Sequence, residues 1–538
     1  MKISKKIEWG MFILLYISLL YLWSLPFQKE QLPYGDVDSG THFTIADYMG
    51  HTGKTFVYLP KYLNKTYYTR INSGKLWYMP HFHLNAAIFQ IIGGQRIIPI
   101  YLYFIIACST IVIASFFLMK KLYGFLPAFS LALLLTFSTR DIMWYLWGQY
   151  PQVMSFGLIP LVIYCYYKNV TSLLDGNYNK LYLLFLSIFL AMQFFIHPQA
   201  LLVSLLFIII YSVFVIIKER KLPVKIKHLF LPILIAIIIL APFLKILVIG
   251  GEKNVYKYSP EFNFDVGGLF KWYPPYAPGG VSPSYYSYKS MHGGYWTIPF
   301  LVIGLILMLI RRKHKDLVLL SLFIAFYLVV HQPIILFGRV ERFIEIEALA
   351  IYPIVITGFF YLGSIFRNKK LIKYILFGLL IVLIINFNGK GAYVYLNNAY
   401  EGIMRINNAQ YDTSVWIRDN LPEDSSIFLI DSYTKIYNSH AKRKWIRVLS
   451  QRHTDWCFDC NSFDDFLNNK TEINQSSIND YSYLIIDYSD LAVFANSDQD
   501  NQKFWQYQIY IINEWEKSHM INSRVLFNKD YTKVYKIE

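Results

Sequence analysis

Long apolar stretches constrain the fold of this chain more than any other feature of its sequence. A helix needs about 20 predominantly apolar residues to cross a hydrocarbon core of roughly 30 Å, and about eleven such stretches occur here. They lie near residues 8–26, 97–119, 122–138, 151–167, 180–196, 199–217, 228–249, 296–310, 316–336, 344–366 and 371–388. Composition agrees, because 55% of the 538 residues are hydrophobic and only 16% are charged. We therefore predict a polytopic α-helical membrane protein, with about 11 transmembrane helices within residues 1–395.

Charges between the stretches predict the orientation of the chain. Lys2, Lys5 and Lys6 precede the first stretch, which is long for a signal peptide and lacks a small-residue cleavage site, so we expect a retained helix. Basic residues then gather in every second connection. They are Lys120, Lys121, Lys168, Lys180, Lys218, Arg220, Lys221, Lys225, Lys227, Arg311, Arg312, Lys313, Lys315, Arg367, Lys369, Lys370 and Lys373. By the positive-inside rule, the N-terminus is cytoplasmic and the tail lies outside the cell membrane. The net charge of +16 arises from an excess of basic residues in the membrane part, before residue 389. It therefore indicates orientation and not a nucleic-acid partner.

Polar side chains gather on the predicted outer side, at span ends or in outer connections. They are Asp36, Asp38, His42, His81, His83, Arg140, Asp141, Gln149, His197, Gln199, His331, Gln332, Arg339, Glu341 and Arg342. A charged group in or beside hydrocarbon costs about 2.5–3.5 kcal/mol, so several on one face predict a water-filled cavity with a function. Any one of them alone is equally explained by helix capping or by a side chain that reaches the interface.

Two long outer segments accompany these residues. The first outer loop, residues 27–95, carries an acidic motif and is predicted to form helices along the membrane surface. The second, residues 250–295, is rich in Tyr, Pro and Gly and is predicted to be an irregular lid or binding loop, or else disordered. Its Trp272 and Tyr273 suit the C–H faces of sugar rings, but aromatic residues are also common at membrane interfaces.

The tail, residues 396–538, is predicted to be a soluble α/β domain outside the cytoplasm. Helical patterns over 413–420 and 502–517 alternate with strand-like runs over 427–430, 483–487, 525–527 and 533–537. Cys457 and Cys460 form a lone C-x-x-C. His440 and His453 lack a convincing spacing for zinc, so we expect a local disulfide in preference to reduced thiols.

Familiar enzyme and transporter signals do not occur in the sequence. It contains no G-x-S-x-G, Walker A, H-E-x-x-H or Rossmann glycine pattern, which argues against an ATP-driven pump. Charges do not recur in mid-span and no two-fold repeat is apparent, whereas ion paths and transporters usually show these features.

The arrangement resembles the GT-C superfamily of glycosyltransferases, which take sugars from polyprenyl-phosphate carriers. One span, an acidic motif at the start of a long outer loop, further spans and an outer C-terminal domain are the shared features. The motif Gly35–His42 (GDVDSGTH) is most similar to the archaeal oligosaccharyltransferase-like branch, and Trp147–Pro151 (WGQYP) and His197–Gln199 (HPQ) look like segments of uncharacterised archaeal members. The tail lacks the W-W-D-Y-G motif of true oligosaccharyltransferases, so we favour a monosaccharide transferase.

The resemblance implies roles for individual residues. Asp38 takes the catalytic position as general base in an inverting displacement, with Asp36 as its helper. Arg339 or Arg342 resembles the basic residue that such enzymes use on the carrier phosphate.

Further residues are assigned to the two substrates. His331 and His197 would assist at the donor phosphate, and the acceptor or sugar would be bound by His42, Gln149, Trp272 and Tyr273. The expected partners are a polyprenyl-phosphate-sugar donor and a glycan, lipid or protein acceptor on the outer face.

Several alternatives stay open. Asp36 and Asp38 are also suited to binding a divalent cation such as Mg²⁺ or Mn²⁺, or to capping the helix that follows them. The whole chain could instead be a surface-glycan polymerase or ligase, which would not need the acidic pair. A lipid or solute transporter without catalysis is the other alternative, and it would tolerate Asp38→Asn.

Overall fold

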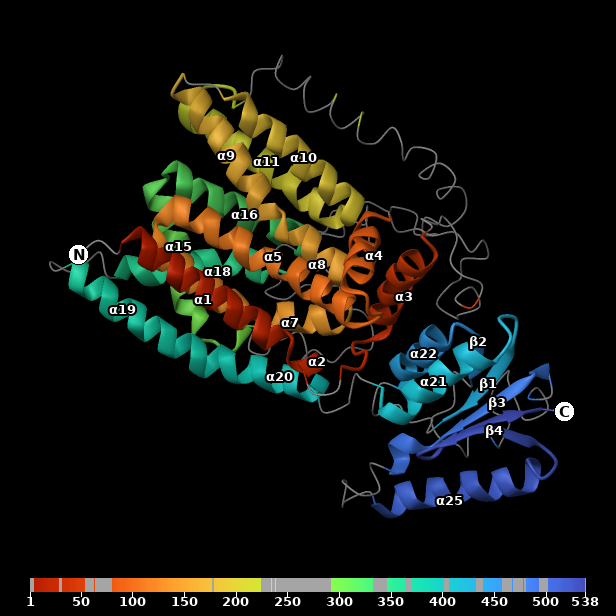
Figure 1. Cartoon of the computed structure of the whole chain (residues 1–538). Helices are drawn as coiled ribbons and strands as arrows, with labels where there is room; N and C mark the ends of the chain where they lie inside the picture. The colour runs from red at the N-terminus through yellow and green to blue at the C-terminus, as the bar shows by residue number, and fades with distance from the viewer. Residues whose placement is uncertain are drawn as a thin grey trace.

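The computed structural model describes residues 4–28, 31–53, 62, 80–176, 179–223, 234, 238, 292–331, 346–362, 369–400, 406–431, 439–456, 467, 478, 480–492 and 502–537. Helices occupy the described chain up to residue 400, and a sheet flanked by helices follows (Figure 1).

The N-terminal part is a bundle of helices. Its members are α1 (Lys5–Trp23), α2 (Leu25–Gln28), α3 (Val37–Thr52), α4 (His81–Gly93), α5 (Ile98–Tyr123), α6 (Phe125–Thr136), α7 (Thr139–Leu146), α8 (Tyr150–Gly157), α9 (Ile159–Leu174), α10 (Lys180–Ile196), α11 (Pro198–Glu219), α15 (Thr297–Arg311), α16 (His314–His331), α18 (Ala348–Leu362), α19 (Lys369–Ile384) and α20 (Lys390–Tyr400), with a π-helical turn, η5 (Ile385–Gly389), before α20.

Most of these helices are apolar enough to lie in a membrane. Among the described residues, six helical segments are long and apolar enough to cross one, or seven if α6 and α7, bent by 43°, form a single broken span. The helices α10, α15 and α18 are apolar but shorter. The chain is thus a polytopic helical membrane protein. The predicted stretch 228–249 lies almost entirely outside the described residues, so the count of eleven spans stays a prediction, as does the orientation.

Local sequence explains where α7 and α8 begin. The Ser138 hydroxyl accepts a hydrogen bond from the amide of Asp141 at 3.4 Å and so caps α7. Pro151 stands in the first turn of α8, where a proline costs no intrahelical hydrogen bond. The short connection left between the two helices, residues 147–149, carries Gln149 back toward the first outer loop.

The described helices of the first outer loop pack against the bundle through aromatic rings. Phe82 of α4 stacks on Phe104 of α5 with ring centroids 5.7 Å apart, and Phe104 stacks on Tyr150 of α8 at 4.1 Å. Helices α3 and α4 also pack on each other. Helix α4 therefore anchors this loop to α5, and α3, which holds most of the acidic motif, packs on α4.

The C-terminal part contains a mixed sheet. Its described elements are α21 (Asn408–Asn420), β1 (Ser426–Ile430), α22 (Ser439–Ser450), β2 (His453–Trp456), β3 (Tyr483–Asp487), α25 (Gln502–His519), β4 (Arg524–Lys529) and β5 (Thr532–Lys536). The strand order is β2-β1-β3-β5-β4, in which β1 runs parallel to β2 and β3, while β5 is antiparallel to β3 and β4. The strands and helices predicted in the tail are confirmed, whereas α22 and β2 were not predicted.

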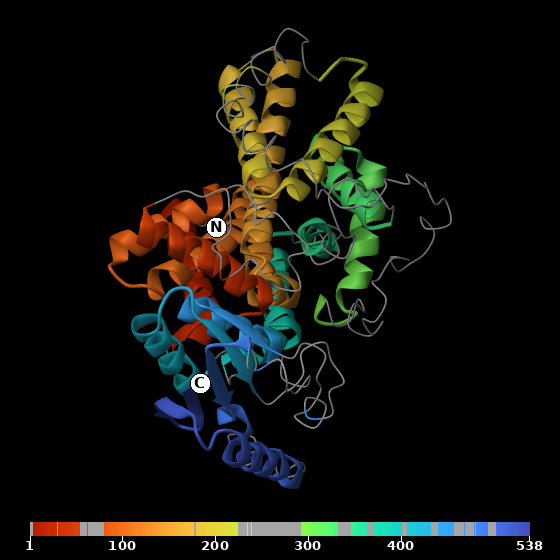
Figure 2. The same ribbon diagram turned by 90° about the vertical axis from the view of Figure 1, so that its right-hand side faces the viewer.

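Different helices pack on the two faces of the sheet. Trp505, Ile512 and Trp515 of α25 pack on one face, and Ile417 of α21 with Ile446 of α22 packs on the other. Figures 1 and 2 show this part at one end of the bundle, next to the first outer loop. Helix α22 makes the junction, because its Trp445, Val448 and Leu449 belong to the same apolar core as the membrane helices.

Candidate active site

Asp38 lies in the first turn of α3, immediately after a turn that is tied to α7. The amide of Asp36 donates to the carbonyl of Leu146 at 3.0 Å, and the carbonyl of Asp36 accepts from the amide of Ser39 at 2.9 Å. Both carboxylates therefore stand at the N-terminal end of a helix, where the helix dipole favours negative charge. Both side chains are half-buried.

The connection between α7 and α8 lies directly against this turn. Gln149 donates a hydrogen bond from its side-chain amide to Oδ2 of Asp38. Gly148 has φ +83°, and a Cβ placed on it would come within 2.1 Å of the Ser39 amide nitrogen. Only glycine both adopts this backbone conformation cheaply and leaves room for the turn. The contact thus fixes one oxygen of Asp38 from a second element.

Buried hydroxyl groups form hydrogen bonds around the turn that precedes α3. Ser39 donates from Oγ to the carbonyl of Tyr34 at 2.8 Å and lies 2.7 Å from the Tyr150 hydroxyl. The hydroxyl of Tyr101 donates to the same Tyr34 carbonyl at 2.6 Å, and it also accepts from the Tyr34 amide at 2.9 Å. Tyr34, Tyr101 and Tyr150 are fully buried. Such a satisfied buried network favours one rigid backbone conformation at the site.

A pair of histidines follows one helical turn after Asp38. His42, four residues later on α3, places Nδ1 at 2.8 Å from Nε2 of His83 on α4, and both rings are buried. Residues four apart on a helix lie on the same face. His42 therefore lies on the Asp38 side of α3, in contact with a residue that had no assigned role.

Helix α22 of the C-terminal part completes the described surroundings of the acidic turn. Lys444 donates from Nζ to Oγ1 of Thr41, and Trp445 donates from Nε1 to the carbonyl of Gly35 at 3.1 Å. Burial lowers the pKa of the Lys444 ammonium to about 8, although the carboxylates of Asp38 and Asp36 oppose that shift. The Lys444 ammonium is thus hydrogen-bonded to the helix that carries Asp38 and is influenced by the charges of both carboxylates.

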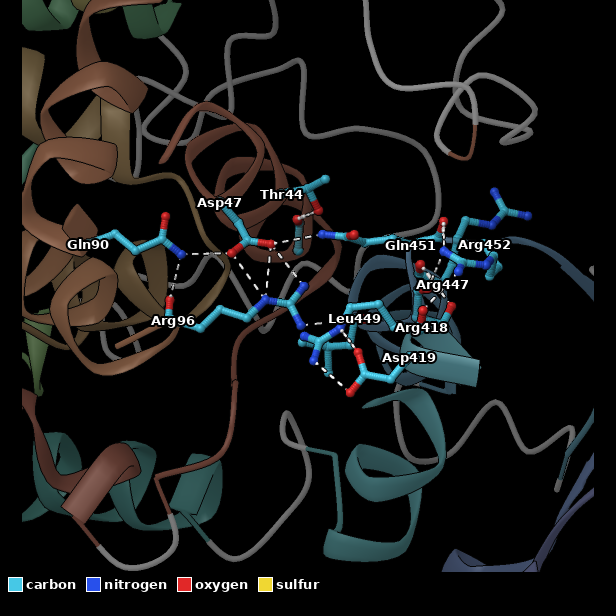
Figure 3. Close-up of polar contacts among 12 residues, drawn as sticks. Thr44, Asp47, Gln90, Arg96, Arg418, Asp419, Arg447, Leu449, Gln451 and Arg452 are labelled. Carbon is cyan, nitrogen blue, oxygen red and sulfur yellow. Dashed lines mark hydrogen bonds and ion pairs between the residues drawn. The ribbon is translucent and has the colours of Figure 1, made fainter. Parts of the chain in front are cut away.

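A second set of polar contacts joins α22 to the first outer loop (Figure 3). Arg96 donates from Nη2 to Oδ2 of Asp47 at 2.8 Å and from Nη1 to the carbonyl of Leu449 at 3.4 Å. Gln90 donates to Oδ1 of Asp47 at 2.7 Å, and Gln451 to its Oδ2 at 3.4 Å. Asp47 of α3 is therefore shared between the membrane part and the C-terminal part.

Comparison with known proteins identifies the family and the fold. Residues 8–334 match a family described as "Family of unknown function (DUF6541)". The chain belongs to this family. A search of curated proteins finds no match.

Solved structures share the fold over nearly the whole chain. The archaeal oligosaccharyltransferase AglB from Archaeoglobus fulgidus, in complex with an inhibitory peptide and a dolichol-phosphate, is 12% identical with a TM-score of 0.57, over 99% of this chain and 75% of that one. ArnT from Cupriavidus metallidurans, bound to undecaprenyl phosphate, is 10% identical with a TM-score of 0.62, over 98% of both chains. Both are GT-C glycosyltransferases, so the predicted resemblance to that superfamily is confirmed for the fold.

The other predicted site residues of this DUF6541 member fall into two groups. Arg339, Arg342, Trp272, Tyr273, Cys457 and Cys460 lie outside the described residues. Among those described, the carbonyl of His197, at the start of α11, accepts from Ser155 of α8 at 2.8 Å. His331, at the end of α16, contacts the carbonyl of Tyr327 through Nδ1 at 2.9 Å. These contacts do not connect either histidine with Asp38. The role of His197 and His331 at the phosphate of the sugar donor stays a prediction.

A divalent cation at Asp36 and Asp38 finds little support in the donor set. Within the described part of the chain, no group of three or more His, Cys, Asp or Glu residues could hold a metal ion. The metal role of Asp36 and Asp38 stays a prediction.

Sequence reasoning missed the contribution of the tail to this site. Lys444 and Trp445 lie in a basic run, Lys442–Arg447, that carries no motif. The available signal was an amphipathic pattern that begins in that run and continues beyond it, because Trp445, Val448 and Leu449 recur at helical spacing. It would have predicted a helix with an apolar face but not the surface that this face covers.

Proposed function

We propose that this protein is a membrane glycosyltransferase that moves a sugar from a polyprenyl-phosphate-linked donor to a hydroxyl group of a glycan, lipid or protein on the outer face, with inversion at the anomeric carbon. Asp38 is the general base. The observation that carries the proposal is the position of Asp38 in a GT-C fold: it opens α3 after the first span and is held by Gln149 from the α7–α8 connection.

The reaction needs a base and a stabilised leaving group. Asp38 accepts the proton of the acceptor hydroxyl, whose oxygen forms the new bond to the anomeric carbon of the donor. The bond from that carbon to the phosphate oxygen breaks, and its electron pair leaves on the polyprenyl phosphate. Attack and departure occur on opposite faces of the sugar, so the configuration inverts.

Binding of the donor phosphate calls for cations near the membrane surface. Arg339 or Arg342 is the proposed ligand, because a guanidinium group binds two phosphate oxygens at once. His331 or His197 is the proposed second contact. Two neighbours support a lipid-phosphate donor, because their structures contain dolichol-phosphate and undecaprenyl phosphate, respectively.

The proposal is tested by replacing the base without changing its shape. Membranes containing Asp38→Asn are supplied with radiolabelled dolichyl-phosphate mannose or undecaprenyl-phosphate glucose, and transfer into lipid and protein fractions is measured. Removing a general base should slow transfer by about 10²–10⁴-fold. Asp175→Asn is the matched control, since Asp175 is exposed beyond α9 and far along the chain from α3, and it should transfer at the unsubstituted rate.

Two results would contradict the proposal. If Asp38→Asn is produced at normal levels and transfers at the unsubstituted rate, Asp38 is not the base. If the unsubstituted chain transfers no sugar but exchanges a lipid or solute across the membrane, and Asp38→Asn does the same, the protein is a transporter.

A further inference from the structure

A group of basic side chains lies at the end of the helix bundle that is remote from the acidic turn. Tyr101, near the start of α5, is hydrogen-bonded to Tyr34 just before that turn, and Tyr123 ends the same helix. At 1.5 Å per residue, Tyr101 and Tyr123 lie about 33 Å apart, which is roughly the thickness of a hydrocarbon core. The surroundings of Tyr123 are therefore at the opposite membrane surface from the proposed active site.

Two of the basic side chains are held in place around Tyr123. Lys315, in the first turn of α16, has its Nζ 4.5 Å from the centroid of the Tyr123 ring. The guanidinium carbon of Arg311, in the last turn of α15, lies 4.2 Å from the ring centroid of Tyr361 on α18. The buried carboxylate of Asp316 accepts a hydrogen bond from Tyr123 at 2.7 Å and pairs with Arg311 at 3.3 Å. Cation–π contacts and one ion pair thus fix the positions of both cations.

Positive charge exceeds negative charge at this place. The ammonium of Lys315 is repelled by Lys313, in the connection between α15 and α16, and by Lys373 of α19. The carboxylate of Asp316 is already paired with Arg311. Within the described residues, none of the three lysines forms an ion pair with a carboxylate. Like charges that gather at one place raise the free energy of the folded chain, so an anion bound among them stabilises it.

Apolar side chains beside the cations favour a lipid over a soluble anion. Leu309 and Ile310, at the end of α15, are exposed, and so is Leu371 of α19, two residues before Lys373. Exposed apolar residues at the end of membrane helices can contact acyl chains, while the neighbouring cations reach the polar headgroups. The combination matches a molecule that carries a phosphate group and hydrocarbon chains together.

We propose that this cation cluster binds the phosphate group of an anionic membrane lipid, at the membrane surface opposite the acidic turn. The cluster consists of Arg311, Lys313, Lys315 and Lys373. Basic residues at the ends of spans also set orientation, but orientation requires only charge and not the ring and carboxylate contacts that fix Arg311 and Lys315. The bound lipid connects the ends of α15, α16 and α19. The inference goes beyond the proposed function and does not depend on it.

Native mass spectrometry of the full-length protein in a neutral detergent tests the proposal. The probe is phosphatidylglycerol, which is anionic, and phosphatidylcholine is the zwitterionic comparison. Phosphatidylglycerol should bind at least about tenfold more tightly, because it has no cationic group to be repelled. Lys315→Gln should weaken its binding about fivefold, which corresponds to about 1 kcal/mol for one basic residue at an anionic lipid surface. Lys315→Arg retains the charge and should stay within about twofold.

A triple variant and a matched control extend the test to the whole cluster. Lys313→Gln, Lys315→Gln and Lys373→Gln together should weaken binding of phosphatidylglycerol by about 10²-fold, since three separate effects of about fivefold multiply. Lys180→Gln removes a charge from the exposed start of α10, outside the cluster, and should bind as the unsubstituted protein does. Phosphatidylglycerol should raise the midpoint temperature of thermal unfolding of the unsubstituted protein and of Lys180→Gln, but not that of the triple variant.

Three results would overturn the inference. The first is equal binding of phosphatidylglycerol and phosphatidylcholine. The second is unchanged binding of phosphatidylglycerol by the triple variant or, if that variant does not fold, by Lys315→Gln. The third is displacement of the lipid by an equal concentration of glycerol 3-phosphate, which has the phosphate but no acyl chains. That displacement would assign the cluster to a soluble phosphate compound. The activity of Asp38→Asn has no bearing on these measurements, so the inference and the proposed function fail separately.

Discussion

Among single residues, Gly148 has little freedom to change. An added Cβ would meet the Ser39 amide nitrogen at 2.1 Å and the Asp38 carbonyl carbon at 2.8 Å, both of which are backbone atoms. Gly148→Ala must therefore push the Gln149 connection away from Asp38. We expect transfer to fall by about 10²-fold, since a misplacement of about 1 Å can have that effect.

Gly176→Ala separates this clash from backbone strain. Gly176, beyond the end of α9, has a similar φ of +76°, but a Cβ added to it would meet no atom within 4 Å. Both alanines sit at positive φ, which costs about 1–2 kcal/mol, so both variants should unfold at slightly lower temperature. Only Gly148→Ala should lose transfer activity, and equal activities would show that the close approach does not matter.

At the scale of elements, α22 is tied to α3 and α4 through a polar cluster centred on Asp47 (Figure 3). The Asp47 side chain is 4% exposed, and Asp47→Ala would leave Arg96 and Gln90 without their shared acceptor. Breaking a buried ion pair from one side costs about 3–5 kcal/mol. We therefore expect a clear drop in the midpoint temperature of thermal unfolding. Tryptophan fluorescence measures this midpoint.

The control for this element is an ion pair in the same region that is open to solvent. Arg418 and Asp419 lie 2.7 Å apart at the end of α21, but Asp419 is 52% exposed. Exposed pairs contribute about 0–1 kcal/mol. Asp419→Ala should leave the unfolding midpoint nearly unchanged. A drop equal to that of Asp47→Ala would show that the Asp47 cluster contributes no more to stability than an exposed ion pair.

At the scale of the whole molecule, the distribution of basic residues predicts which ends face outward. Lys313, in the connection between α15 and α16, should be cytoplasmic, whereas Lys517 of α25 should lie outside. A membrane-impermeant maleimide should label Lys517→Cys in intact cells but Lys313→Cys only after permeabilisation. Both positions are exposed, so access is not limited by folding, and the unsubstituted chain measures the labelling of its own cysteines. The reverse pattern would place the proposed active site in the cytoplasm.

Local patterns in the sequence predicted the elements well. The apolar stretch at 97–119 is the helix Ile98–Tyr123, and the strand-like run at 483–487 is β3. Asp38 was singled out because it follows the first span in a motif resembling that of GT-C enzymes, and it does open α3. Helix and strand periodicity, hydropathy and capping depend on neighbouring residues, so one sequence is sufficient to predict them.

Tertiary structure decided which of these pieces meet. Gln149 reaches Asp38 across 111 residues, and Lys444 reaches Thr41 across 403. Lys444 lies in a basic run without a motif, and its place beside the acidic turn follows from the burial of Trp445 against Phe43. The sequence by itself indicated the apolar helices that the structure describes, four of the five strands of the described sheet, and the acidic turn. The partners of that turn were decided by packing between distant segments, because such contacts depend on the shape of the folded chain and leave no local pattern.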